Sequence, residues 1–140
     1  MRTIKFRGKC IDNYLWEYGW LYCKDGKYYI KDGVNDTVKL FLVNQDTIGQ
    51  FTGLSDRNGK EIYEGDIVQG LEYADFYTGI DGEVNAVVTW DGNSASFVFD
   101  AECKYYCALS VCKAVTVIGN IHDNPELVKI DDNELGLKLS

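Results

Sequence analysis

The segment from residue 47 to residue 68 constrains the fold of this chain more than any other part. It begins TIGQFTGL, continues through a polar stretch that ends in Asn58-Gly59-Lys60, and closes with EIYEGDIV. An Asn-Gly pair accepts positive φ angles at little cost, so it reverses a chain sharply. Gly65 interrupts a strand-like pattern, where glycine usually marks a bulge or a bend. The segment therefore predicts two strands joined by a tight turn and a kink into a third.

Further strands are predicted on both sides of this segment. Asp25-Gly26 is a strong hairpin turn that joins the aromatic stretch 14–22 to a partner strand at 27–31. Alternating or β-rich patterns place the other strands at 4–9, 38–43, 83–90, 96–99 and 114–121. We expect a long loop over 71–82, and the pattern leaves a short helix and a loop open for 101–112. Asn124-Pro125 predicts the start of a short helix.

Short strands with glycine-rich turns and no long helical pattern predict a mainly β protein built as a small barrel or roll. Ten tyrosines and a single proline in 140 residues agree with this class. The predicted divisions are an aromatic β-hairpin region over 1–45, a barrel core over 46–128 and an acidic tail over 129–140. No apolar run approaches the ~20 residues that span a bilayer. The basic N-terminus also lacks the apolar core of a secretion signal, so we expect a cytoplasmic protein.

Three blocks of the sequence resemble the YopX family of proteins encoded in bacteriophages and prophages. They are IKFRGK at 4–9 with WEYG at 16–19, the two strand-like parts of 47–68, and VIGNIHDNPEL at 117–127. The resemblance implies a mostly β protein with an SH3-like barrel core, and it carries no established activity. The cysteine-bearing insert from Glu102 to Lys113 matches no family motif, so the resemblance supports no role for its thiols.

Carboxylates gather at the bend of the 47–68 segment. Glu61, Glu64 and Asp66 could hold a divalent cation or share acid and base roles. At a turn, such side chains equally cap backbone N–H groups. Because no second carboxylate pair or partnering histidine stands at a telling spacing, we interpret the segment as structural. The residues expected to hold turns and bends are Gly49, Gly53, Gly59, Glu64, Gly65, Asp66, Gly119, Asn120 and Pro125.

Neither a metal site nor a catalytic site is predicted. Cys103, Cys107 and Cys112 lack the two-residue spacing of most zinc knuckles, although a zinc site completed by His122 stays an alternative. Five cysteines without an export signal argue against a disulfide framework, and we expect small buried hydrophobes. No nucleophile elbow, phosphate loop or zinc-protease motif is present in the sequence. The sequence thus predicts a protein that is not an enzyme and needs no cofactor.

Binding to another protein, or to further copies of this chain, is the first functional hypothesis. Trp16, Trp20 and Tyr22 fall on one side of an extended chain, and aromatic side chains anchor protein interfaces. The alternative is that these rings fill the core.

The second hypothesis is a nucleic-acid accessory protein, for example in replication or packaging. Lys5, Arg7 and Lys9 would share one face of the first strand, opposite Ile4 and Phe6. We interpret that face as a solvated outer surface. A net charge of −8 also opposes binding to phosphates, so a protein partner is favoured and no membrane is involved.

Overall fold

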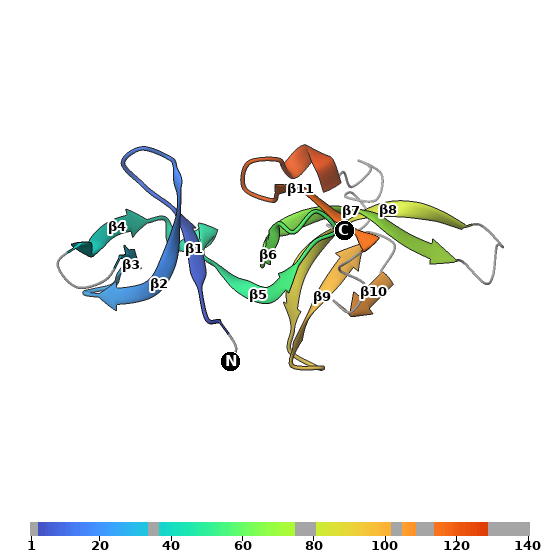
Figure 1. Cartoon of the computed structure of the whole chain (residues 1–140), viewed down its shortest axis with the longest axis horizontal. Helices are drawn as coiled ribbons and strands as arrows, with labels where there is room; N and C mark the ends of the chain where they lie inside the picture. The colour runs from blue at the N-terminus through green and yellow to red at the C-terminus, as the bar shows by residue number, and fades with distance from the viewer. Residues whose placement is uncertain (1–2, 34–36, 75–80, 102–104, 109–113, 129–140) are drawn as a thin grey trace, which may run out of the picture. The chain divides into compact units, whose positions relative to one another are not determined.

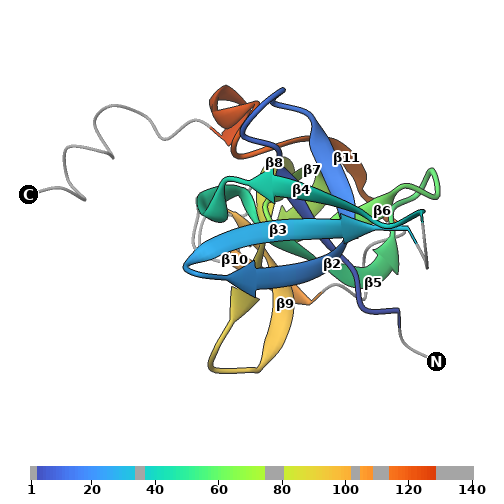
Figure 2. The same ribbon diagram turned by 90° about the vertical axis from the view of Figure 1, so that its left-hand side faces the viewer.

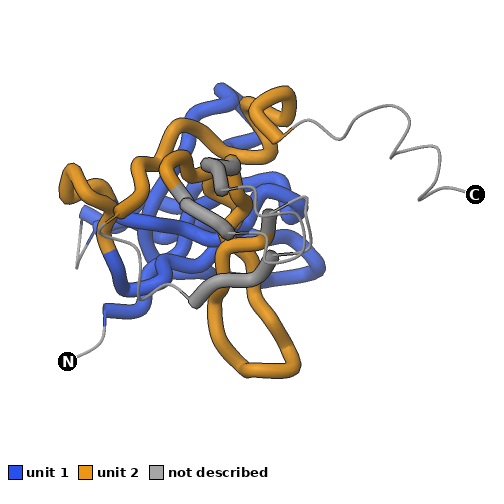
Figure 3. Tube along the Cα trace, turned by 90° about the vertical axis from the view of Figure 1, so that its right-hand side faces the viewer, with its two compact units in different colours: residues 1–54, 61–64 blue, residues 55–60, 65–140 orange. Residues whose placement is uncertain are grey.

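Antiparallel strands make up almost all of the described chain in this computed structural model (Figure 1). The described residues are 3–33, 37–74, 81–101, 105–108 and 114–128. Two compact units divide the chain: residues 1–54 with 61–64 form unit 1, and residues 55–60 with 65–140 form unit 2 (Figure 3). The predicted mainly β class is confirmed. The predicted acidic tail, 129–140, lies outside the described residues.

Unit 1 contains a six-stranded antiparallel sheet with the strand order β4-β3-β2-β1-β5-β6. Its strands are β1 (Phe6–Lys9), β2 (Trp16–Lys24), β3 (Lys27–Asp32), β4 (Lys39–Val43), β5 (Gly49–Ser55) and β6 (Glu61–Tyr63), with a 3-10 turn η2 (Gln45–Thr47) before β5. The predicted Asp25-Gly26 hairpin is confirmed, because both residues have positive φ angles, 53° and 75°. These angles match a turn whose twist suits the flanking strands.

Unit 2 contains a five-stranded antiparallel sheet with the order β10-β9-β8-β7-β11. Its strands are β7 (Asp66–Ala74), β8 (Asp81–Asp91), β9 (Ser96–Ala101), β10 (Tyr105–Ala108) and β11 (Thr116–Asn120), followed by a 3-10 turn η4 (Pro125–Val128). Ile67, Val68, Val88, Phe99 and Val115 are fully buried in this unit. The predicted short helix is therefore present as η4, which begins at Pro125.

Two sequence predictions for this second sheet need correction. The expected loop over 71–82 is wrong, since β7 continues to Ala74 and β8 starts at Asp81, with Glu72 opposite Glu83. Only residues 75–80 of that stretch lie outside the described part of the chain. Residues 105–108, for which a short helix or a loop was expected, form strand β10 against β9.

Both sheets are open, so the predicted barrel is not a closed one within the described residues. Strands β4 and β6 are the edges of the first sheet, and β10 and β11 are the edges of the second. An isolated bridge between Cys10 and Val43 brings β4 to the end of β1 in unit 1. Helices are almost absent, and no helix in the described residues has the length and apolar character needed to cross a membrane.

The turn before β6 is tied to the second sheet by a buried carboxylate. Asp56 is 2% exposed, and its Oδ1 atom accepts bonds from the N–H groups of Asn58 (2.8 Å) and Lys60 (2.9 Å). Its Oδ2 atom accepts a bond from the N–H of Val117 at 2.9 Å. The predicted turn is confirmed at Asn58-Gly59, where Gly59 has a φ of 83°. The bond from Asp56 to β11, across 61 positions, was not predicted.

Candidate functional site

One face of the unit 1 sheet is lined by aromatic and basic side chains. Ile30 and Val43 are 0% and 2% exposed and point to the inner side of β3 and β4, so their neighbours in the alternation point outward. Strand pairing aligns the outward positions across the sheet, with Trp20 opposite Lys31 and Lys31 opposite Leu40. We call this set the outer face: Arg7, Lys9, Trp16, Tyr18, Trp20, Tyr22, Lys24, Lys27, Tyr29, Lys31, Leu40 and Leu42. Figure 2 shows β2, β3 and β4 side by side.

Rings and cations alternate on the β2–β3 part of the outer face. Trp20 is 64% exposed, and its strand neighbour Tyr22 is half-buried. The Tyr22 ring lies 6.0 Å from the Tyr29 ring, and the Lys31 Nζ atom lies 5.2 Å from the centre of the Tyr22 ring. The predicted partner-binding residues Trp20 and Tyr22 are thus on one accessible surface. Their neighbours Tyr29 and Lys31 were missed, although the Asp25-Gly26 turn fixes the register that places them there.

Arg7 is buried rather than solvated, which corrects the prediction for the β1 face. It is 5% exposed, while Ile4, expected on the buried side, is 53% exposed. The Arg7 guanidinium carbon lies 4.8 Å from the Trp16 ring centre and 5.1 Å from the Tyr63 ring centre, a double cation–π arrangement. One Nη atom also donates a bond to the carbonyl oxygen of Glu64 at 3.4 Å. Trp16 therefore packs against Arg7, which makes its ring less available to a partner than the ring of Trp20.

Lys5 and Lys9 were also expected to be solvated, and both are partly buried, less so than Arg7. The Lys5 ammonium is 2.9 Å from the carboxylate of Glu61 and 5.4 Å from the centre of the Phe51 ring. Lys9 is paired with Trp16 in the β1–β2 register. Of the three carboxylates that suggested a metal or an acid–base site, Glu61 is thus engaged in an ion pair with Lys5.

The remaining acidic residues of the bend do not form a reactive group. Asp66 is buried at the start of β7, and no three histidine, cysteine or carboxylate side chains converge on a metal-sized site anywhere in the described residues. Tyr63 donates its hydroxyl to Glu61 at 3.2 Å. Burial, followed by the nearby Glu61 charge, raises the pKa of the Tyr63 hydroxyl well above its ordinary value, so this group stays protonated.

The third family block forms a tight structural turn after β11. The Asn120 Oδ1 atom accepts bonds from the N–H groups of His122 and Asp123, each at 3.0 Å. A Cβ atom on Gly119 would collide with the Asn124 side chain. His122 is exposed on this turn. Asn120 and Gly119 therefore shape the chain at this turn.

The thiols of the described residues show no shared site. Cys10 is buried and Cys23 is exposed. Cys103 and Cys112 lie outside the described residues, and only the backbone of Cys107, in β10, is described.

We expect protein purified without a chelator to contain far less than one zinc per chain. Elemental analysis measures this directly, with the same protein after dialysis against a chelator as the control. Stoichiometric zinc, removed by the chelator, would revive the site formed by Cys103, Cys107, Cys112 and His122.

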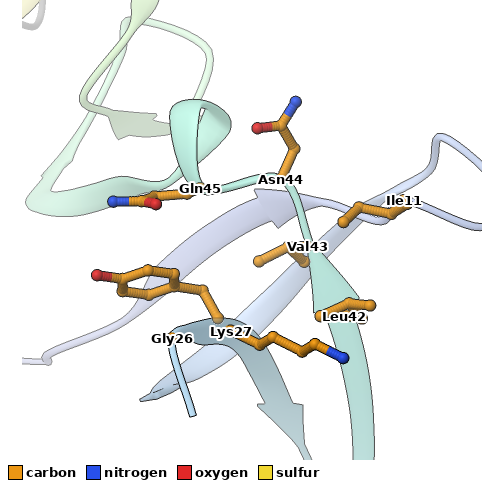
Figure 4. A pocket seen from close by; sticks show the side chains of 8 residues that line it. Ile11, Gly26, Lys27, Leu42, Val43, Asn44 and Gln45 are labelled. Atoms are coloured by element: carbon orange, nitrogen blue, oxygen red, sulfur yellow. The ribbon is translucent and has the colours of Figure 1, made fainter. Parts of the chain in front are cut away.

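A pocket of about 430 Å³ opens in unit 1 beside the outer face (Figure 4). It is lined by Ile11, Gly26, Lys27, Tyr28, Leu42, Val43, Asn44 and Gln45. Of these eight residues only Lys27 carries a charge, so the lining offers no acid–base pair. Two of its lining residues, Lys27 and Leu42, belong to the outer face, whereas Val43 points to the inner side.

Charge is divided unequally between the two units. Unit 1 has eight basic and eight acidic residues, whereas unit 2 has six basic and fourteen acidic residues. The whole net charge of −8 therefore belongs to unit 2. None of the outer-face residues is acidic, although Glu17, Asp25 and Asp32 are each next to an outer-face residue along the chain.

Comparison with known proteins assigns this arrangement to a family. The YopX protein family matches residues 5–129. The chain belongs to the YopX family. Two solved structures share the fold: protein EF1440 from Enterococcus faecalis, with 23% identity, a TM-score of 0.56 and coverage of 92% of this chain and 100% of that one; and protein yopX from Bacillus subtilis, with 18% identity, a TM-score of 0.55 and coverage of 94% and 99%. No curated relative matches the sequence.

Proposed function

We propose that this YopX-family member is a non-enzymatic binding protein and that the outer face is its binding surface. The proposal places it in a phage or prophage, as the family resemblance implies, and in the cytoplasm of the bacterial host, as predicted from the sequence. The SH3-like character of the core is likewise a prediction from the resemblance. What supports the binding role is the exposed Trp20 beside Tyr22 and Tyr29, on a sheet whose other face buries Ile30 and Val43. Exposed aromatic clusters of this kind mark interaction sites.

Binding to a protein, or to further copies of the chain, is the first partner class. Trp20 and Leu40, at 64% and 51% exposed, provide the apolar anchors that interfaces use. The nucleic-acid class is the second, and the division of charge weakens the objection to it. The net charge of −8 opposes phosphate binding, but all of it belongs to unit 2.

Replacing Trp20 with alanine is expected to abolish most capture of the natural partner from prophage-bearing host cells. The side chain is 64% exposed, so its removal should remove contact area while leaving the fold intact. Affinity capture with the tagged full chain, with and without nuclease, measures the effect.

Trp90→Ala is the matched control, because Trp90 is 50% exposed on β8 of unit 2. Equal capture by wild type and Trp20→Ala, or an equal loss in both variants, would contradict the assignment of the outer face.

A further inference from the structure

We propose that the outer face binds single-stranded nucleic acid, with bases stacked on Trp20 and Tyr22 and phosphates held by Lys24, Lys27 and Lys31. This inference rests on the proposed function, since it names the ligand of the same surface. It differs from the sequence-based hypothesis, which relied on Lys5, Arg7 and Lys9.

The rings are placed as a stacking platform. Trp20 and Tyr22 are separated by one residue on β2, which sets them about 6.8 Å apart along the strand. Tyr18, the preceding residue of this row, is 43% exposed. Every nucleobase has a π face, and unpaired bases stack on successive aromatic side chains without regard to sequence. Trp20 is the most open ring of this row, since Lys31 lies over the Tyr22 ring and Tyr18 packs edge to face on Tyr63 at 5.4 Å. Trp20 is therefore the first stacking position for an extended single strand, and a base on Tyr22 would displace the Lys31 side chain.

One of the three cations, Lys31, lies beside the rings, and the other two are at the hairpin end of the same face. Lys31 is paired with Trp20 and reaches over the Tyr22 ring at 5.2 Å, and Lys24 is paired with Lys27 at the hairpin end of the same face. All three lysines are exposed. Phosphates that follow stacked bases would meet these ammonium groups, which supply the salt-dependent part of the affinity. Arg7 and Lys5 are less suited, because one is buried between rings and the other is paired with Glu61.

Charge complementarity and composition favour this ligand over a protein. Lysine is depleted at protein interfaces, yet three exposed lysines alternate with the rings on the outer face. In a duplex, the bases are stacked on one another and cannot reach the rings, so a double strand would use only its phosphates. A single strand is the ligand that uses both the rings and the cations.

Fluorescence anisotropy of the full chain with a labelled oligothymidine of about 16 nucleotides tests this directly. We expect binding at low salt that is tighter than for a duplex of the same length. Three phosphate contacts predict that the logarithm of the dissociation constant rises with the logarithm of the salt concentration with a slope of about 2. Trp20→Ala should weaken binding by about 5- to 150-fold, the loss of one stacked base.

Two variants with the same change in net charge distinguish a specific contact on the outer face from a general effect of net charge. Lys31→Glu should weaken binding and lower the salt slope by about 1. Lys39→Glu changes the net charge equally, but Lys39 is paired with Asp32 on the other alternation of β3 and β4, so it should leave affinity nearly unchanged. Equal effects of the two lysine variants would overturn the proposed site.

Polyglutamate provides the competing outcome. If it binds as tightly as the oligonucleotide and Trp20→Ala weakens it, the ligand is an acidic protein; the nucleic-acid inference is then wrong, and the outer face remains the binding surface. If the oligonucleotide binds with affinity that Trp20→Ala and Lys31→Glu leave unchanged, both the inference and the assignment of the outer face are wrong. Absence of oligonucleotide binding at low salt overturns the inference alone.

Discussion

Gly65→Val is expected to lower the stability of the protein by about 1–3 kcal/mol from backbone strain alone. Gly65 is buried with a φ of 91°, a conformation that is most strained for β-branched residues. Its N–H donates to the Val88 carbonyl at 2.8 Å and its carbonyl accepts from Ile121 at 2.9 Å, so the backbone cannot relax without breaking bonds. Thermal unfolding followed by circular dichroism should show a fall of several degrees in Tm.

Two other glycines of unit 2 serve as controls for this effect. Gly59 also has a positive φ, 83°, but a Cβ atom there would meet nothing within 4 Å. Gly92 has the same open surroundings and no positive φ. The expected order of destabilisation by valine is Gly65, then Gly59, then Gly92. A Gly65→Val variant that melts with the Gly92→Val variant would show that the kink does not require glycine.

Local turn chemistry explains what could be predicted from the sequence. Asp25-Gly26 and Asn58-Gly59 carry their own conformational preference, so both turns lie where the residues placed them. Strand β11 and the Pro125 turn followed from equally local patterns. Such signals depend on neighbours along the chain and therefore survive without knowledge of the tertiary structure.

The burial of Arg7 shows what alternation cannot decide. A period of two separates the two faces of β1, but it does not say which face another strand covers. Trp16 and Tyr63 come from β2 and β6, and their rings cover the guanidinium that a charge-based argument places in water. The end of β7 up to Ala74 and the start of β8 at Asp81 were not predicted, for a related reason. Their pairing at Glu72 and Glu83 rests on backbone bonds between strands, which leave no apolar period in the sequence.

Part of the candidate site could be predicted from the sequence. Trp20 and Tyr22 were identified because they lie on one strand, and the partners on β3 required the hairpin register. Net charge was the weaker guide. The net charge of −8 is the sum of a neutral unit and an acidic one. Phosphate binding depends on the charges near the binding surface, because salt screens distant charges. The division into units could not be read from composition, since residues 61–64 join the first unit after the chain has entered the second.

Asp56→Asn is expected to destabilise the protein strongly at neutral pH. The carboxylate accepts three backbone N–H bonds, and its bond from Val117 is buried. An asparagine keeps one acceptor oxygen but turns an NH₂ group toward a donor. A buried N–H left without a partner costs about 1–3 kcal/mol, and the lost bond is also a charge-assisted one. Urea unfolding of wild type and variant measures the difference.

The pH dependence of that difference identifies the carboxylate charge as its cause. Burial raises the pKa of the Asp56 carboxyl, but the N–H groups of Val117, Lys60 and Asn58 outweigh it and hold the pKa below 3.8. A carboxyl with a depressed pKa in the folded state stabilises the protein above its unfolded value and loses that contribution as the pH falls. The gap between wild type and Asp56→Asn should therefore be full at pH ~7 and shrink below pH ~4.

Asp91→Asn is the matched control for this experiment. Asp91 accepts bonds from the Asn93 N–H at 3.1 Å and the Ser94 hydroxyl at 2.8 Å, and the Ser94 hydroxyl is the first cause of its lowered pKa. These bonds lie on an exposed turn, where water replaces a lost partner, so we expect a much smaller effect at neutral pH. A gap for Asp56→Asn that is constant or grows as the pH falls would mean that the ionised carboxylate does not hold the turn to β11. The loss in Asp56→Asn would then come from the changed hydrogen-bonding groups at the Val117 N–H and not from the carboxylate charge.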